Sequence, residues 1–181
     1  HKEGFANFVT RNRNVVRIEL VGDVMKDAAE YFSGFAEAKT TNAVKDIIKT
    51  PFALCTIHRA ENLNNTNRLQ NIFTALNDIA LTIPVILPIH PGTAKTLQGM
   101  NIHISGNIKV IDPVGFFDML TLLKHATCVL TDSGGLQKEA FFSRKPCITL
   151  RDETEWTELV EHGYNKLAGA DTALIKKHFT T

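Results

Sequence analysis

The ten residues TDSGGLQKEA, 131–140, combine the features of a phosphate-binding turn. An apolar run leads into Asp132, and Ser133 is a suitable N-cap for a helix that starts at Gly134 or Gly135. The unpaired N–H groups at a helix start carry partial positive charge and suit a phosphate. Glycine within a helix costs about 1 kcal/mol relative to alanine. The pair therefore indicates that the space has another use, such as the close approach of phosphate oxygens.

Glu139 lies four residues beyond Gly135, on the same helix face and one turn further in. Its carboxylate is placed to accept hydrogen bonds from a sugar diol beside the phosphate. The alternative is that Ser133 only caps the helix and the glycines ease packing, and spacing alone does not separate the two. The chain has no G-x-G-x-x-G or Walker lysine here. It is no G-x-S-x-G nucleophile elbow either, because Thr131 stands two residues before Ser133.

A second group of ionisable residues follows two other apolar runs. TIHRAEN places His58, Arg59 and Glu61 after one run, and His90 ends the next in LPIHPGT. A lone histidine is more often structural, but two histidines and an arginine at one sheet edge favour anion binding. A metal site has weaker support, since neither a cysteine nor H-x-x-x-H spacing accompanies them. We expect no metal and no cofactor.

Short β-rich runs alternate with segments of helical period, which predicts a Rossmann-like α/β fold. A parallel sheet with helices on both faces follows from such alternation with short connections. Ligands bind beyond the carboxyl ends of the strands in sheets of this kind, where the ionisable residues gather. The polar stretch 33–50 is expected to be a loose connection. The predicted strands span 15–20, 52–58, 84–90, 108–112, 127–132 and 146–151, with 165–170 completing the run.

Composition narrows the class of protein. The chain has 181 residues, 44% hydrophobic and 22% charged, which suits one globular domain. A net charge of +1 without a basic stripe gives no reason to expect a nucleic-acid partner. The apolar runs are too short to span a bilayer, and no signal peptide opens the chain. The first residue is not methionine, which suggests a fragment. Cys55, Cys128 and Cys147 are predicted to be buried free thiols of a cytoplasmic protein.

Several motifs together carry a resemblance to a known family. HRAEN, HPGT, DP…FFDML, TDSGGLQKEA, LRDETEW and NKLAGAD follow one another as in the C-terminal half of non-hydrolysing UDP-N-acetylglucosamine 2-epimerases. The likeness runs nearly end to end. It implies one half of a two-domain, glycosyltransferase-B-type architecture with the nucleotide sugar between domains. Residues 1–45 would be a hinge segment and leading helix, and 46–181 the nucleotide-sugar-binding domain. The N-terminal catalytic domain and the C-terminal crossover helix would be absent.

The same resemblance implies roles for the residues of the turn. Ser133, Gly134 and Gly135 would hold the UDP pyrophosphate, and Glu139 would hold the ribose. The turn GFFDM would border the uracil, with Met119 at a position that is often aromatic. The resemblance thus favours the ligand explanation of the glycine pair.

Other matched positions concern the sugar and regulation. His58 would lie by the phosphates and the sugar as a catalytic residue. Arg59 and His90 match contacts of a second, regulatory UDP-GlcNAc in bacterial members. Trp156 stands in TEW where many members have TER. This pattern resembles a subgroup that includes enzymes for UDP-diacetamido-glucuronate, so the sugar stays open.

The activity implied is inversion at C2 of UDP-N-acetylglucosamine to UDP-N-acetylmannosamine, by elimination and re-addition of UDP. The enzyme would be a cytoplasmic homodimer serving cell-envelope polysaccharide biosynthesis. Because the acid–base carboxylates of the family lie mainly in the N-terminal domain, we expect this chain alone to be inactive. The rival functions are a glycosyltransferase C-terminal domain and a flavodoxin-like binding module.

Overall fold

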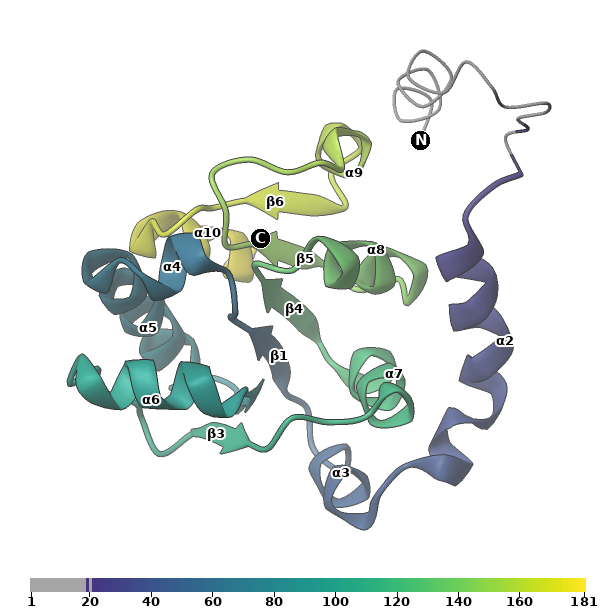
Figure 1. The fold of residues 1–181 in the computed structure, drawn as a ribbon, viewed down its shortest axis with the longest axis horizontal. Coiled ribbons are helices and arrows are strands. Elements are labelled where there is room, and N and C mark those ends of the chain that lie inside the picture. Colours follow the sequence, from purple (N-terminus) through teal and green to yellow (C-terminus); the bar gives the residue numbers. More distant parts are fainter. Residues whose placement is uncertain (1–18, 20) are drawn as a thin grey trace.

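A parallel six-stranded sheet forms the centre of the molecule (Figure 1). The computed structural model describes residues 19 and 21–181. The strands run in the order β3-β2-β1-β4-β5-β6 and all neighbours pair in parallel. They are β1 (Ala53–Thr56), β2 (Val85–Pro88), β3 (Ile108–Ile111), β4 (Cys128–Thr131), β5 (Cys147–Thr149) and β6 (Asn165–Leu167).

Helices connect these strands and cover both faces, which confirms the predicted fold class. In the part of the chain that the structure describes, no helix is long and apolar enough to cross a membrane. The predicted strand at 15–20 falls on residues outside the described part, apart from Glu19. The helices are α2 (Val24–Lys39), α3 (Asn42–Ile47), α4 (Ala60–Leu63), α5 (Thr66–Ile79), α6 (Pro91–Gly99), α7 (Phe116–His125), α8 (Gly134–Phe142), α9 (Thr157–Glu161) and α10 (Thr172–Thr180).

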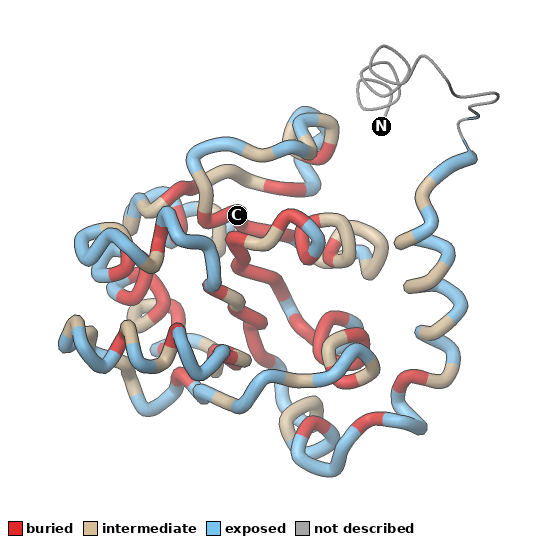
Figure 2. Tube along the Cα trace, viewed as in Figure 1, coloured by how far each residue is buried: buried red, intermediate tan, exposed pale blue. Residues whose placement is uncertain are grey.

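Each face of the sheet has its own hydrophobic layer. Side chains alternate between faces along a strand, so Ala53 and Cys55 of β1 join one layer and Leu54 joins the other. The first layer takes in α5, α6 and α10, and the second takes in α3, α7 and α8. Figure 2 shows the buried residues following the strands between the two layers.

Helix α5 shows how directly the pattern determines the packing. Asn65 caps it by accepting a hydrogen bond from the Arg68 N–H at 3.1 Å. The predicted apolar face is buried throughout, which anchors the helix to the sheet and points its polar face to solvent. The buried positions of that face are Leu69, Ile72, Phe73, Leu76 and Ile79.

The expectation of a loose connection over 33–50 was wrong, because α2 and α3 occupy most of it. Hydrogen bonds to α7 hold the short link between them. The Thr40 and Thr121 hydroxyls lie 2.6 Å apart, and the Thr41 N–H donates to the Asp118 carboxylate at 2.8 Å. The polar residues that suggest a loop are therefore the ones that fasten this segment to the domain.

The three cysteines are free thiols and buried, as predicted. Burial raises the pKa of Cys128 to about 12. Burial raises the pKa of Cys147 to about 12 as well, and the nearby Cys128 adds to it against a hydrogen bond from Thr149. Thiols so far from ionisation are packing groups and poor nucleophiles.

Replacement of Asp118 by Ala should weaken the attachment of α3. The change leaves the Thr41 N–H without its charged acceptor, so the free energy of unfolding should fall by about 1.5–3 kcal/mol. Urea denaturation measures this. Asp46→Ala, on the exposed side of α3, removes only a surface ion pair and should leave the free energy of unfolding close to that of wild type. Equal effects would show that the 40–47 segment is not held through Asp118.

Candidate functional site

Asp132, directly after β4, joins two turns at the carboxyl edge of the sheet. Its side chain is fully buried. The carboxylate accepts hydrogen bonds from the backbone N–H groups of His58 and Arg59, both at 3.0 Å. It also accepts from the Asn62 side-chain amide at 3.1 Å. Charged acceptors make strong hydrogen bonds, so Asp132 fixes the turn after β1 against the turn after β4.

These two strands meet where the order of the sheet reverses. From β1 the chain proceeds outward to β2 and β3, and from β4 it proceeds the other way to β5 and β6. Such a switch point opens a crevice beyond the carboxyl ends of the strands, where open α/β sheets bind ligands. The residues that follow β1 and β4 therefore line the expected ligand position.

His58 is oriented by the same carboxylate. Its Nδ1 lies 3.1 Å from Asp132 Oδ1, and half of its side chain (52%) is exposed. A carboxylate at this distance favours the proton on Nδ1. The other ring nitrogen, Nε2, is then available to a ligand in the crevice.

The turn 133–135 starts a helix, as predicted, with Ser133 as N-cap. The Ser133 hydroxyl accepts from the Leu136 N–H at 3.4 Å, and the Ser133 N–H donates to the Thr131 hydroxyl at 2.9 Å. The N–H groups of Gly134 and Gly135 have no acceptor among the described residues. Two unpaired donors at a helix start can bind an anion.

The two glycines have different surroundings. A β-carbon at Gly134 would collide with the Glu155 carboxylate and lie 3.6 Å from the Trp156 indole nitrogen. Packing within the protein therefore favours glycine at 134, because a side chain there would displace the end of the Glu155 side chain. A β-carbon at exposed Gly135 would make only ordinary contacts, at 3.9 Å or more. Gly135 is the one whose open space can admit a ligand, so the packing explanation accounts for one glycine of the pair only.

Glu139 lies half-buried on α8, one turn in from Gly135. No hydrogen bond or ion pair to its carboxylate is found within the described part of the chain. Burial raises the pKa of its carboxyl. A desolvated acceptor without a protein partner is suited to a ligand hydroxyl, which keeps the predicted ribose contact open.

At the start of α7, Phe116 is more exposed than Met119, the residue that the resemblance places beside the uracil. Met119 is half-buried and packs against the hydrophobic layer of α7 and α8. Phe116, in the first turn of α7, is 47% exposed. The sequence alone does not separate Phe116 from its neighbour Phe117. The two differ in how far the fold leaves them exposed.

Arg59 and His90 lie at the predicted edge, each at the N-cap position of a helix, and only the His90 side chain makes a capping hydrogen bond. Arg59 is exposed at the N-cap of α4. His90 occupies the N-cap of α6, where its Nδ1 accepts from the Gly92 N–H at 3.2 Å. Within the described residues no contact joins either side chain to His58. The described part also contains no group of three or more His, Cys, Asp or Glu side chains that could hold a metal ion.

Gln137 and Trp156 hold the turn 133–135 through hydrogen bonds to the loop after β5. These contacts were not predicted from the sequence. The Gln137 amide, fully buried, accepts from the Thr154 hydroxyl at 2.7 Å. That hydroxyl accepts in turn from the Trp156 N–H at 3.2 Å. The Trp156 indole N–H donates to the Gly134 carbonyl at 2.8 Å. The loop after β5 is thereby fastened to the first turn of α8.

Comparison with known proteins assigns the family. The family model described as UDP-N-acetylglucosamine 2-epimerase matches residues 2–181. The chain belongs to the UDP-N-acetylglucosamine 2-epimerase family. It is 46% identical over 164 residues to the UDP-2,3-diacetamido-2,3-dideoxy-D-glucuronate 2-epimerase of Pseudomonas aeruginosa, covering 90% of this chain and 45% of that protein.

Solved structures agree with this assignment. The Methanocaldococcus jannaschii UDP-GlcNAc 2-epimerase in complex with UDP-GlcNAc and UDP matches with a TM-score of 0.84 and 36% identity. The match covers 97% of this chain and 51% of that one. The chain thus spans about half the length of the relatives it matches.

Charged side chains continue along the sheet edge from the turn. Arg151, 13% exposed, contacts Glu155 at 2.7 Å and Glu61 at 3.6 Å. Burial would raise the pKa of Glu155, but a backbone hydrogen bond and the charges of Arg151 and Arg59 leave it below its ordinary value. Glu155 is therefore an ionised group beside the turn.

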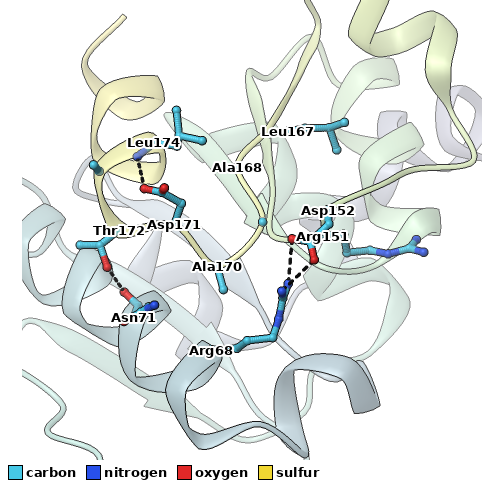
Figure 3. A pocket seen from close by; sticks show the side chains of 12 residues that line it. Arg68, Asn71, Arg151, Asp152, Leu167, Ala168, Ala170, Asp171, Thr172 and Leu174 are labelled. Atoms are coloured by element: carbon cyan, nitrogen blue, oxygen red, sulfur yellow. Dashed lines mark hydrogen bonds and ion pairs between the residues drawn. The ribbon is translucent and has the colours of Figure 1, made fainter.

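A hollow of about 800 Å³ lies beyond Arg151, between the loop after β5 and the start of α10 (Figure 3). Arg68 closes one side of it. Its guanidinium reaches Asp152 at 2.8 Å and the Asn62 side-chain oxygen at 3.0 Å. Asn62 also bonds to Asp132, so a continuous set of polar contacts links the hollow to the turns.

Replacement of Asp132 by Asn should loosen both turns of the epimerase fold. The neutral amide offers one acceptor oxygen to several buried N–H donors, so the free energy of unfolding should fall by about 3 kcal/mol or more. Amide hydrogen exchange should quicken at Arg59. Asp112→Asn, an exposed residue after β3, is the matched control. The same stability in both variants would refute the central role of Asp132.

Proposed function

We propose that this chain is the UDP-binding half of an epimerase that inverts C2 of UDP-N-acetylglucosamine by eliminating and re-adding UDP. The observation that carries the proposal is the pair of unpaired N–H groups at Gly134 and Gly135, positioned beside His58 at the switch point of the sheet. Anion donors at this position are what a nucleotide diphosphate requires. Membership of the epimerase family supports the reaction type.

The proposal extends to the remaining contacts of UDP, which the resemblance to the family implies. The pyrophosphate would lie on the turn Ser133–Gly135, and the Glu139 carboxylate would accept from the ribose diol. The start of α7, with Met119 on its buried side, would border the uracil.

UDP must stay bound between elimination and re-addition, so the enzyme needs a strong anion site throughout. Arg151 and Arg59 add positive charge near the turn, although Glu155 and Glu61 neutralise part of it. His58 would act at the sugar side, with Nε2 toward the leaving phosphate oxygen. Its bond to Asp132 keeps the ring in place for this function.

Inversion also needs an acid and a base on opposite faces of C2, each within hydrogen-bond reach of the transferred proton. One sheet edge presents groups to one face only. The opposing carboxylates would come from an N-terminal half, with residues 1–45 as hinge segment and leading helix. We further propose Arg59 and His90 as contacts of a regulatory UDP-GlcNAc, and a cytoplasmic homodimer as the working form.

A second sugar is supported by one specific observation. The Pseudomonas aeruginosa relative, 46% identical, is named for UDP-2,3-diacetamido-2,3-dideoxy-D-glucuronate. The same chemistry on that uronate is therefore the alternative substrate. A UDP-sugar glycosyltransferase has no such support, although it would share the architecture.

Incubation of the full-length protein with UDP-GlcNAc in D₂O tests the reaction. Without any acceptor, we expect UDP-ManNAc and deuterium at C2, because the proton is removed and replaced by solvent. The UDP-diacetamido sugar is assayed in parallel. The 181-residue chain alone should incorporate no deuterium, since it supplies one face only and leaves the other to water. A strict acceptor requirement would instead indicate a glycosyltransferase, and exchange catalysed by this chain alone would refute the division between halves.

Glu139→Gln should separate ribose binding from a structural role. Loss of a charged acceptor removes about 1.5–3 kcal/mol of binding free energy, so the Kd for UDP should rise about tenfold or more. Because burial raises the pKa of Glu139, its ionised form destabilises the fold once pH exceeds that pKa, and the variant should be no less stable at neutral pH. Calorimetric titration and urea denaturation measure the two effects. An unchanged Kd with lower stability would make Glu139 structural.

A further inference from the structure

Asp23 connects the start of α2 to α8. Its carboxylate caps α2 by accepting from the Met25 N–H at 2.9 Å, and it forms an ion pair with Lys138 of α8. The Lys138 side chain is only 14% exposed. Burial would raise the pKa of Asp23, but the hydrogen bonds from Lys138 and Met25 and the Lys138 charge leave it below its ordinary value. Asp23 is therefore ionised, and about a third of its side chain (32%) is exposed.

From Lys138 the contacts continue to the phosphate-binding turn. The Lys138 ammonium lies 4.3 Å from the centre of the Trp156 ring, a cation–π distance. The Trp156 indole N–H donates to the Gly134 carbonyl at 2.8 Å. On the other side of the turn, the Met25 methyl group lies 3.9 Å from the position of a β-carbon on Gly135. The start of α2, which stands beside α8 in Figure 1, thus reaches the turn through Lys138 and Trp156, and Met25 lies near the open space at Gly135.

The bond to Gly134 has a geometric consequence for the turn. The Gly134 carbonyl and the Gly135 N–H belong to one planar peptide unit. A donor that fixes the carbonyl therefore fixes the direction of the Gly135 N–H, one of the two unpaired donors. A β-carbon on Gly134 would lie 3.6 Å from the indole nitrogen, so Trp156 packs directly against this peptide.

We infer that the chain of contacts Asp23–Lys138–Trp156–Gly134 couples the segment entering α2 to the phosphate-binding turn, with Trp156 as a positioning residue. The inference rests on the proposed function, in which the chain enters this half from the N-terminal half through α2. A shift of that segment would move Asp23, and the Gly135 N–H would turn with it. UDP binding and the relation between the halves would then influence each other, since such coupling is reciprocal.

Asp23→Asn is the sharpest test, because the coupling and simple electrostatics predict opposite results. Asparagine keeps the N-cap but loses the ionic bond to Lys138. Removal of a negative charge near a phosphate should tighten UDP binding if only charge matters. The coupling predicts weaker binding, with the Kd for UDP raised about threefold to tenfold. Asp27→Asn, exposed in the same first turn, is the control with the same charge change.

Trp156 is the only tryptophan of the 181 residues, so its indole N–H signal reports the contact directly. In ¹H–¹⁵N spectra of this chain, UDP should shift that signal together with the amides of Gly134 and Gly135. Asp23→Asn should shift it without UDP, and Asp27→Asn should not. Trp156→Phe keeps the ring but lacks the N–H, and should weaken UDP binding as Asp23→Asn does.

The outcomes separate this inference from the function on which it rests. If UDP shifts Gly134 and Gly135 but every variant binds it equally, the coupling is overturned and the proposed site stands. If Asp23→Asn tightens binding, charge alone acts and the coupling is again overturned. If wild type shows no UDP-dependent shift at the turn, even at millimolar UDP, the proposed function fails and the coupling fails with it.

Discussion

The buried carboxylate of Asp132 is the interaction on which the candidate site depends. It stands at the end of β4 and holds the backbone of the turn after β1, so two segments more than seventy residues apart in sequence keep one geometry. Without it, the His58 ring would lose its fixed orientation, and the turn 133–135 would lose its fixed neighbour. Its burial is tolerated because each oxygen is supplied with N–H donors.

Support for the turn comes from a second layer of contacts on its other side. Gln137 and Trp156 fasten the loop after β5 to the first turn of α8. Gly134 is part of this arrangement, since its missing side chain makes room for the end of the Glu155 side chain. Protein contacts therefore fix the backbone of the turn, while its N–H donors find no acceptor among the described residues. Such preorganisation lets backbone donors bind an anion without reordering.

Periodicity and strand-end chemistry predicted much of this structure. The apolar runs at 52–58 and 127–132 became β1 and β4, and the helical spacing over 67–80 became the buried face of α5. Those signals are local, and the packing preserved them. The segment 33–50 was misjudged because its hydroxyl groups find partners on α7, far along the chain. The functions of Asp132, Gln137 and Trp156 escaped for the same reason, since each depends on a partner that only the fold brings near.

The account is tested most directly by titrating the ¹⁵N-labelled 181-residue chain with UDP and following its backbone amides. If UDP binds at the switch point, the amide signals of Gly134, Gly135 and His58 should shift first and most. The Kd should be on the order of 0.1–1 mM, because the facing half is absent. Residues at the opposite edge of the sheet, such as Thr127 and Tyr164, should stay unchanged. Shifts confined to that opposite edge, with none at Gly134 and Gly135, would contradict the account.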